Sequence, residues 1–363
     1  MQSHLLSPYQ RGRLRLKNRV IMAPLTRCRA DNPDWAPTSL HAEYYRQRAG
    51  AGLIISEGSP VSPMAIGYPY SPGIYSPKQV EGWKKVTRAV HDAGGILFCQ
   101  LWHVGRISHP DFLGGNKPLG PSAINPGTIQ RTLKGRKPTV TPKAMTVEEI
   151  HHTTEDFRKA AFNAIEADFD GVEIHAANGY LFHQFLAKSA NIRTDNYGGS
   201  IENRCRFLLE TLDAVTREIS PQKTAVRLNP YLHNNKGIDL DDETISLFDR
   251  LVDRLNGYDL AYLHLTEPFT DITGHPWGHP EVAKHFRPIY RGTLMINKGF
   301  TFESGNRIIK EGFADLVAFG KLFISNPDLP ERFARGAPLA EADESTFYTQ
   351  GPKGYIDYPA LPD

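Results

Sequence analysis

The chain has 363 residues, of which 40% are hydrophobic and 23% are charged, and its 42 Lys and Arg residues nearly balance 40 Asp and Glu residues. The net charge is only +2, and no segment forms a block of like charge typical of a nucleic-acid-binding surface. We therefore expect no nucleic acid partner. No apolar run approaches the roughly 20 residues that span a bilayer. The first residues lack the basic and apolar regions of a secretion signal, and we expect a cytoplasmic protein without a membrane partner.

Eight short apolar runs, rich in β-branched residues and ending in glycine, proline or polar residues, predict strands. They occupy residues 19–23, 52–58, 96–100, 171–175, 224–228, 261–265, 293–297 and 316–320. Segments with helical spacing lie between the strands. One follows Ser76-Pro77 and runs to Asp92, and another begins with a capping box at Thr146 and runs to Ala167.

Strands that alternate with helices eight times predict a (β/α)8 TIM barrel, an α/β fold, formed as a single domain by residues 1–363. The alternative is an open, doubly wound sheet. Such a sheet needs a glycine-rich phosphate loop after its first strand, and Ala23-Pro-Leu-Thr-Arg27 contains no glycine.

Two segments exceed the minimal barrel. Residues 5–16, with turn residues at their centre, predict a hairpin that closes the lower end of the barrel. Residues 103–142 form a long excursion after the third strand that is rich in glycine and proline and basic at residues 134–137. A connection this long is usually functional, and its position predicts a lid or wall on the active face.

Catalytic groups in such barrels lie at the carboxyl ends of the strands, where this chain carries a short set of polar residues and glycines. The set consists of Thr26, Gly58, Gln100, Trp102, His175, Asn178, Tyr180, Arg227, Lys298, Gly299, Gly320 and Lys321.

The fourth strand and the residues after it carry the clearest chemical pattern. Strand alternation turns Glu173 and His175 toward the inside of the barrel. His175 and Asn178 can then donate to one carbonyl oxygen, and the Tyr180 hydroxyl can give a proton to a carbanion or enolate. The alternative reading is a hydrogen-bonded core histidine followed by an ordinary aromatic residue at a helix start.

The last two strands end in Lys298-Gly299 and Gly320-Lys321, where backbone N–H groups and lysine charges suit a phosphate group. Tight turns with solvated lysines are the alternative. Arg227, in the middle of the fifth strand, points into the barrel and requires an anionic or strongly accepting partner. Glu173 and an anionic cofactor are both candidates.

Metal and disulfide chemistry find no support in the sequence. His151 and His152 are adjacent at a helix start and cannot both face one ion, and no H-E-x-x-H motif occurs. Cys28, Cys99 and Cys205 are far apart and odd in number, so they form no disulfide framework.

Four motifs together resemble the old yellow enzyme family of flavin-dependent ene-reductases. They are Ala23-Pro-Leu-Thr-Arg27, Gln100-Leu-Trp-His-Val-Gly-Arg106, Gly171-Val-Glu-Ile-His-Ala-Ala-Asn-Gly-Tyr180 and Arg193-Thr-Asp-Asn-Tyr-Gly-Gly-Ser-Ile-Glu-Asn-Arg204. The resemblance extends over the whole chain. Thr26 and Trp102 are similar to the longer, classical members, the branch of N-ethylmaleimide reductase and pentaerythritol tetranitrate reductase.

The resemblance implies a non-covalent FMN on top of the barrel. NADPH, or else NADH, would reduce it and leave before the oxidised substrate binds in the same place. Thr26 would bind the flavin carbonyl near the reactive nitrogen, while Gln100 and Arg227 would hold the pyrimidine edge. The other expected cofactor contacts are Ala23, Pro24, Leu25, Gly58 and His175, with Lys298, Gly299, Gly320 and Lys321 around the phosphate.

For the substrate, the resemblance implies that His175 and Asn178 hold its carbonyl or nitro oxygen and that Tyr180 protonates its α-carbon. The pocket would be lined by Thr26, Tyr68, Trp102 and Tyr348. The implied reaction is the reduction of the activated C=C bond of enones and maleimides, and also of nitro compounds, by a monomer or homodimer.

Two departures from the family pattern stand at the phosphate position. Lys321 replaces the more frequent arginine and offers a point charge without a bidentate fork. Asn297-Lys298 stand where small residues are expected. Two other functions remain open, a flavin-binding redox sensor without a substrate and a phosphosugar-binding barrel without flavin.

Overall fold

Eight parallel strands form a closed barrel in this computed structural model, which describes residues 3–362. In chain order they are β3 (Val20–Met22), β4 (Leu53–Ile55), β6 (Leu97–Trp102), β11 (Gly171–Ala176), β12 (Thr224–Leu228), β13 (Tyr262–Thr266), β14 (Leu294–Asn297) and β15 (Leu316–Phe319). Pairing of β11 with β6 and of β15 with β3 completes the ring, and β5 (Ser59–Pro60) adds to the edge of β6. The predicted barrel and its eight strands are confirmed.

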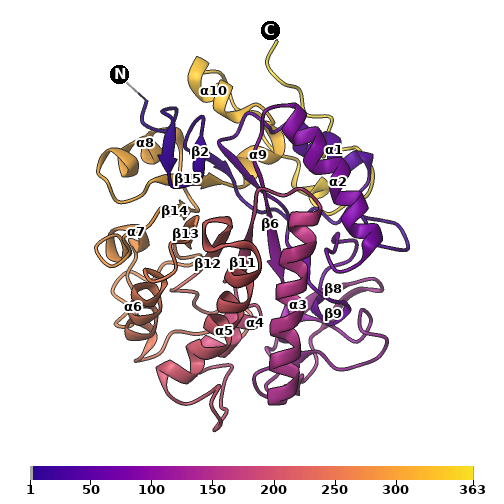
Figure 1. The fold of residues 1–363 in the computed structure, drawn as a ribbon, viewed down its shortest axis with the longest axis vertical. Helices are drawn as coiled ribbons and strands as arrows, with labels where there is room; N and C mark the ends of the chain where they lie inside the picture. The colour runs from indigo at the N-terminus through magenta and orange to yellow at the C-terminus, as the bar shows by residue number, and fades with distance from the viewer. Residues whose placement is uncertain (1–2, 363) are drawn as a thin grey trace.

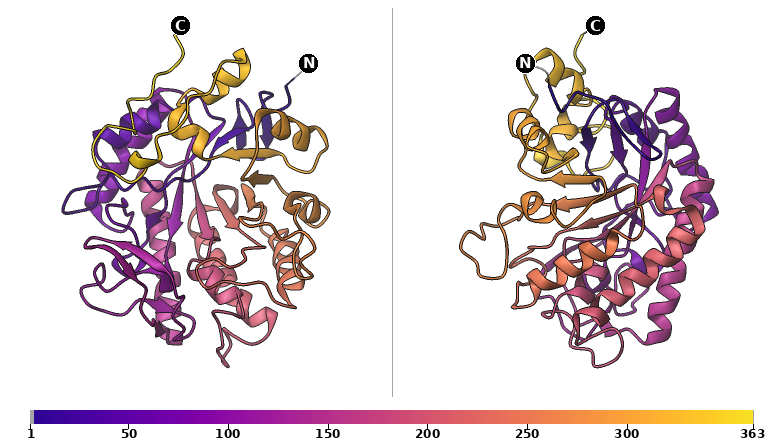
Figure 2. Two further views of the ribbon diagram at one scale, coloured as in Figure 1. Left: turned by 180° about the vertical axis from the view of Figure 1, so that it is seen from behind. Right: turned by 60° about the vertical axis from the view of Figure 1, so that its left-hand side comes forward.

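Helices connect successive strands and surround the barrel (Figures 1 and 2). They are α1 (Ser39–Arg46), α2 (Pro77–Asp92), α3 (Val147–Glu166), α4 (Leu181–Leu186), α5 (Ile201–Ile219), α6 (Thr244–Leu255), α7 (Val282–Phe286), α8 (Phe302–Lys310), α9 (Lys321–Ser325) and α10 (Leu329–Arg335). Thr146 caps α3 with the predicted capping box, and Ser76 begins α2 as predicted, where the structure also shows a capping box with Gln79. No helix in residues 3–362 is long and apolar enough to cross a membrane.

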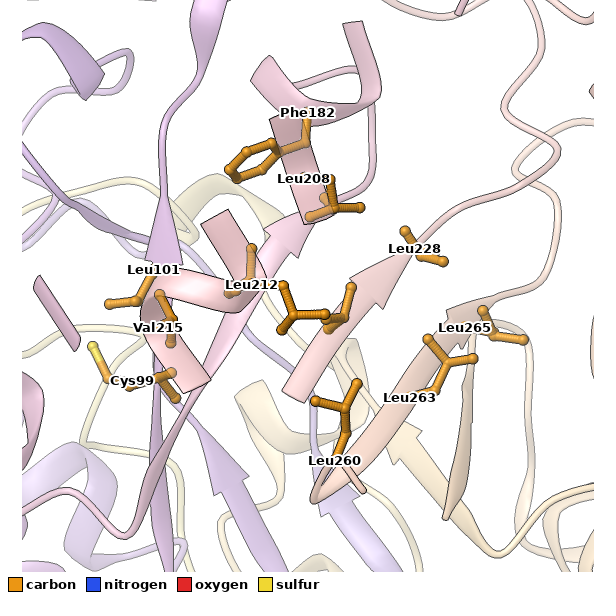
Figure 3. Packing of buried hydrophobic residues seen from close by; sticks show 14 of the residues in the cluster. Cys99, Leu101, Phe182, Leu208, Leu212, Val215, Leu228, Leu260, Leu263 and Leu265 are labelled. Atoms are coloured by element: carbon orange, nitrogen blue, oxygen red, sulfur yellow. The ribbon is translucent and has the colours of Figure 1, made fainter. Parts of the chain in front are cut away.

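The main core lies between the outer faces of the strands and the helices. Figure 3 shows Leu208, Leu212 and Val215 of α5 beside apolar residues of the strands, among them Leu101 and Leu228. This packing uses the residues that alternate with the inward polar ones, so the same strands supply both the core and the site.

The chain before the barrel forms the predicted hairpin. Strands β1 (Tyr9–Arg11) and β2 (Leu14–Leu16) are antiparallel. Tyr9, Leu14 and Leu16 pack in one cluster with inward residues of the barrel such as Phe98 and Met295, so the hairpin closes the barrel at one end.

The excursion of residues 103–142 contains more regular structure than its composition suggests. It includes the 3-10 turn η2 (Gly105–Ile107), strand β7 (Leu119–Gly120), which pairs with β10 (Lys143–Ala144), and a hairpin of β8 (Ile129–Thr132) and β9 (Gly135–Pro138). The side chain of Gln130 donates to the carbonyl of Gly67, and the guanidinium of Arg131 lies 5.1 Å from the ring centroid of Tyr348. The hairpin therefore contacts residues close to the carboxyl ends of the strands.

Candidate active site

A cavity of about 590 Å³ opens at the carboxyl ends of the strands. Eight of the predicted site residues line it, namely Pro24, Leu25, Thr26, Tyr68, Asn178, Tyr180, Lys321 and Tyr348. The remaining predicted residues lie in or directly after the barrel strands. In the part of the chain that the structure describes, no cluster of His, Cys, Asp and Glu side chains could hold a metal ion, and the three cysteines are buried and free.

His175 is an inward residue of β11 with a defined tautomer. Its Nδ1 accepts the backbone N–H of Ala177 at 3.3 Å, so the neutral ring carries its proton on Nε2. Burial, followed by the positive charge of Arg227, holds the pKa of His175 well below its usual value. His175 is therefore a neutral hydrogen-bond donor through Nε2.

Asn178 sits in the left-handed region with φ at 57°, a conformation that asparagine tolerates better than most residues. Its Oδ1 accepts from Nδ2 of Asn229 at 3.0 Å. This bond engages the amide oxygen and leaves the Asn178 NH2 group free to donate. The sequence analysis missed Asn229, whose signal is its position as the first residue after β12.

Tyr180 is the N-cap residue of α4, and only 7% of its surface is exposed. Its hydroxyl donates to that of Tyr68 at 3.2 Å. Burial and the neighbouring Tyr68 raise the pKa of Tyr180 well above its usual value, so the hydroxyl keeps its proton at neutral pH. Tyr180 is thus both the helix start and a protonated group in the pocket wall.

Trp102 is the aromatic centre of the site. Its ring centroid lies 5.0 Å from that of Tyr180, 5.3 Å from that of Tyr68 and 6.2 Å from that of His175. A Cβ atom at Gly58 would lie 2.6 Å from the indole, so glycine at this position makes room for Trp102. The structure gives Gly58 this packing role, in addition to the cofactor contact expected from the sequence.

The floor of the site is a buried polar network inside the barrel. Glu173 accepts from Gln100 Nε2 at 2.7 Å and contacts Nδ1 of His264 at 2.8 Å. Burial alone would raise the pKa of Glu173, but the contacts with His264 and the charge of Arg227 outweigh it and lower the pKa. Strand register aligns these groups, since Glu173 pairs with Gln100 and Arg227 pairs with His264.

Arg227 does not form an ion pair with Glu173, one of the two partners considered for it. Its Nη2 instead donates to Oδ1 of Asn297 at 3.2 Å, and Asn297 Nδ2 donates in turn to the carbonyl of Ala318. Among residues 3–362, the buried Nε of Arg227 has no hydrogen-bond partner. A buried guanidinium with an unused donor fits an acceptor-rich or anionic group above it, as a flavin pyrimidine edge would be.

The ends of β14 and β15 present backbone rather than lysine charge. Lys298 and Gly299 both have positive φ, at 84° and 80°, and a Cβ built on Gly299 would meet no described residue within 4 Å other than its chain neighbours. The ammonium of Lys298 donates to the carbonyls of residues 268 and 269, while that of Lys321 pairs with Glu344 at 2.5 Å on the surface. Gly320 is the N-cap residue of α9, and a Cβ there would lie 3.5 Å from Cδ2 of Leu25.

Tyr348 lies at the rim of the cavity, with 45% of its surface exposed. The C-terminal segment that carries it is held by Arg27 and Arg29, which donate to backbone carbonyls of residues 346–354. Arg27 was noted in the sequence only as part of a motif, because the carbonyls of Phe347 and Gly354 to which it donates are more than 300 residues away in the chain.

A closed barrel with this polar floor and this donor set defines a class, the flavin-dependent oxidoreductases. The model of the NADH:flavin oxidoreductase / NADH oxidase family matches residues 4–340. The chain belongs to this family, and within it to the old yellow enzymes, as the four sequence motifs predicted. It is an ene-reductase of the old yellow enzyme type.

Relatives along the whole chain agree with this assignment. The chain is 45% identical to 12-oxophytodienoate reductase 1 of Oryza sativa subsp. japonica, with 98% of this chain and 93% of that protein covered. It is 42% identical to 12-oxophytodienoate reductase 2 of Arabidopsis thaliana, with 98% and 96% covered.

Solved structures give the same result. An old yellow enzyme homologue from Zymomonas mobilis superposes with a TM-score of 0.94 at 43% identity, covering 98% of this chain and 99% of that one. Morphinone reductase superposes with a TM-score of 0.93 at 46% identity, with 99% and 96% covered. One structure of morphinone reductase contains tetrahydroNAD.

Proposed function

We propose that this ene-reductase uses FMN and NADPH to reduce the activated C=C bond of α,β-unsaturated carbonyl compounds, such as enones and maleimides. The observation that carries the proposal is a segment with two donors, His175 Nε2–H and the Asn178 amide, and with the protonated hydroxyl of Tyr180, whose ring centroid lies 5.1 Å from that of His175. A nitro group offers oxygens that can accept from the same donors, and we include nitro compounds among the substrates.

The residues present fit a non-covalent FMN. Gln100 and the unused donor of Arg227 would hold the pyrimidine edge, and Thr26 would bind the ring from the cavity wall. The open backbone at Gly299 and Gly320 would take the phosphate, with the remaining expected contacts from residues 23–25 and from Lys298 and Lys321. When bound, the flavin carries a hydride from the nicotinamide to the substrate.

The basic hairpin supports NADPH over NADH as the reductant. Arg131 lies at the cavity rim against Tyr348, and Lys134 and Arg136 are exposed on the same hairpin. Lys137 is partly neutralised by an ion pair with Asp111. The positive charge of this hairpin, with Arg131 against the rim residue Tyr348, would favour the additional phosphate of NADPH. NADH, which lacks this phosphate, is the alternative donor.

In the substrate half of the reaction, we assign His175 and Asn178 to the oxygen of the carbonyl group. Two neutral donors at one oxygen withdraw charge from the alkene and stabilise the enolate that develops after hydride reaches the β-carbon. Tyr180 then transfers its hydroxyl proton to the α-carbon. Tyr68, Trp102 and Tyr348 would position the apolar part of the substrate.

The test starts from the purified protein and its cofactor. We expect a yellow protein that releases FMN on denaturation, and stopped-flow mixing of the reduced protein with enones, maleimides, nitro-olefins and quinones should reoxidise it. A colourless protein would support a phosphosugar-binding barrel instead. A yellow protein that is reduced by NADPH but not reoxidised by any alkene would support a redox sensor. Light scattering would distinguish a monomer from a homodimer.

A further inference from the structure

Lys236, in the loop between β12 and α6, lies against the proposed proton donor. Its Nζ is 4.1 Å from the centroid of the Tyr180 ring and donates to the backbone carbonyl of Asn178 at 2.9 Å. Its side-chain stem packs on Gly179, where an added Cβ would lie 3.1 Å from the Cβ of Lys236. In the described part of the chain, the ammonium thus meets a carbonyl and an aromatic face, and no carboxylate is paired with it.

The loop that carries Lys236 is held in place by the third-strand motif. Arg106, which is buried after β6, donates through Nη2 to the carbonyls of Lys236 and Gly237. A Cβ at Gly237 would lie 2.9 Å from the same nitrogen, so the loop and the guanidinium are in close contact. This backbone anchor means that the position of Lys236 does not depend on its own ammonium.

A cation on the face of a phenol ring has a definite electrostatic effect. It is attracted to the electron-rich face of the ring, and it is attracted more strongly to the phenolate than to the neutral phenol. Burial of Tyr180 acts in the opposite direction, because it makes loss of the hydroxyl proton costly. A lysine at this position therefore offsets part of the free-energy cost of forming a buried tyrosinate when the proton leaves.

We propose that Lys236 is a positioning residue for proton delivery, whose ammonium stabilises the tyrosinate that remains when Tyr180 protonates the substrate. The step balances as follows. Hydride supplied by NADPH through the cofactor adds to the β-carbon, and the C=C π electrons shift to give an enolate whose charge lies on the carbonyl oxygen. The C=O bond then re-forms as the enolate takes the proton of Tyr180 at its α-carbon, so that one C–H bond forms as the O–H bond of Tyr180 breaks. Water then reprotonates the tyrosinate. The inference rests on the proposed alkene reduction and on Tyr180 as the donor.

Charged and titratable groups from several elements surround Lys236. They are Tyr180 at the N-cap of α4, His183 of α4, His175 of β11, Arg227 of β12 and Arg106 of η2. Burial and then the charge of Arg227 lower the pKa of Lys236 to about 8. The ammonium is present below this pH and is lost above it, so the aid to proton transfer should decline as the pH rises through about 8.

The test compares Lys236→Met, Lys236→Arg and the matched control Lys188→Met with the wild-type holoenzyme. Lys188 is a surface lysine paired with Asp242 and Glu243. We expect Lys236→Met to slow reoxidation of the reduced enzyme by cyclohexenone roughly tenfold, with Lys236→Arg restoring most of the rate. In both Lys236 variants, the rate of reduction by NADPH and the melting temperature should match those of the wild type. In Lys188→Met, the rates of both half-reactions should also match the wild type.

Two further measurements distinguish an electrostatic role of Lys236 from a merely structural one. The decline in the wild-type reoxidation rate above about pH 8 should be absent from Lys236→Met. In the Tyr180→Phe background, Lys236→Met should have no additional effect, because no tyrosinate forms. Equal slowing in both backgrounds, or a Lys236→Met rate equal to the wild type, would overturn the inference. Failure of the wild type to reduce any alkene would instead refute the proposed function.

Discussion

Asn229 Nδ2 donates to Asn178 Oδ1 at 3.0 Å, across the ends of two neighbouring strands. The contact decides which end of the Asn178 amide faces the pocket. If the amide were free to turn its Oδ1 toward the substrate oxygen, two hydrogen-bond acceptors would face each other, and the substrate oxygen would lose one of its donors.

Asn229→Asp should therefore impair substrate binding, because an aspartate offers no donor to Asn178 Oδ1. We expect kcat/KM for enones to fall by roughly tenfold or more, with reduction by NADPH changed less. Asn229→Ser keeps a hydroxyl donor for Asn178 Oδ1, so its kcat/KM should fall less. Steady-state kinetics of the Asn229 variants, with and without Asn178→Ala, measure the coupling between Asn229 and Asn178. Fully additive effects would show that Asn229 does not act through Asn178.

Tyr180→Phe should slow alkene reduction by roughly a hundredfold while NADPH still reduces the flavin, because only the second half-reaction needs the proton. Stopped-flow absorbance measures the two halves separately. Tyr68→Phe is the control, since it removes the hydroxyl that accepts from Tyr180 and leaves the donor in place. A parallel fall in both half-reactions of Tyr180→Phe would contradict the donor role.

Arg227→Met should weaken flavin binding by roughly tenfold or more, because its buried guanidinium, with Nε unused, is the charged group that we assign to the pyrimidine edge. Fluorescence of released flavin on dilution measures the dissociation constant. Arg250→Met removes an exposed arginine paired with Glu202 and serves as the control. Equal retention of flavin in the two variants would place the cofactor elsewhere.

His103 predicts a pH dependence of stability. It is buried, its Nδ1 accepts the N–H of Gly105 at 3.0 Å, and burial lowers its pKa from 6.5 to about 3. The unfolded chain therefore binds a proton below about pH 6.5 that the folded protein excludes, and stability is lost as the pH falls. This loss amounts to about 1.4 kcal/mol per pH unit for the one group.

His103→Gln keeps an acceptor for the Gly105 N–H and removes the titration. Urea unfolding should show the variant less stable than the wild type near neutral pH, and the difference should shrink by about 2 kcal/mol at about pH 5. Parallel curves for the two proteins would mean that His103 becomes protonated in the folded state.

The main lines of the fold follow from local patterns in the chain. Each of the eight strands is a short apolar run, and capping residues such as Ser76 and Thr146 mark where helices begin. Alternation also placed Glu173 and His175 inside the barrel, because successive side chains of a strand point to opposite faces. The family resemblance then supplied roles for Tyr180 and Arg227 that residue chemistry alone left open.

Partners across the barrel could not be predicted in the same way. Asn297, not Glu173, binds Arg227, and His264 contacts Glu173 from a strand whose histidine had attracted no functional interpretation. These contacts depend on the register between strands, which follows from closure of the whole barrel and leaves no local trace in the chain.

The sequence by itself determined the barrel, the family and the residue types at the strand ends, since these depend on periodicity and on motifs of neighbouring residues. Only the tertiary structure decided the protonation, orientation and contacts of those residues. It sets the tautomer of His175, the orientation of the Asn178 amide and the position of Lys236 on Tyr180. Each of these depends on a burial or a contact between groups that the closed barrel brings together.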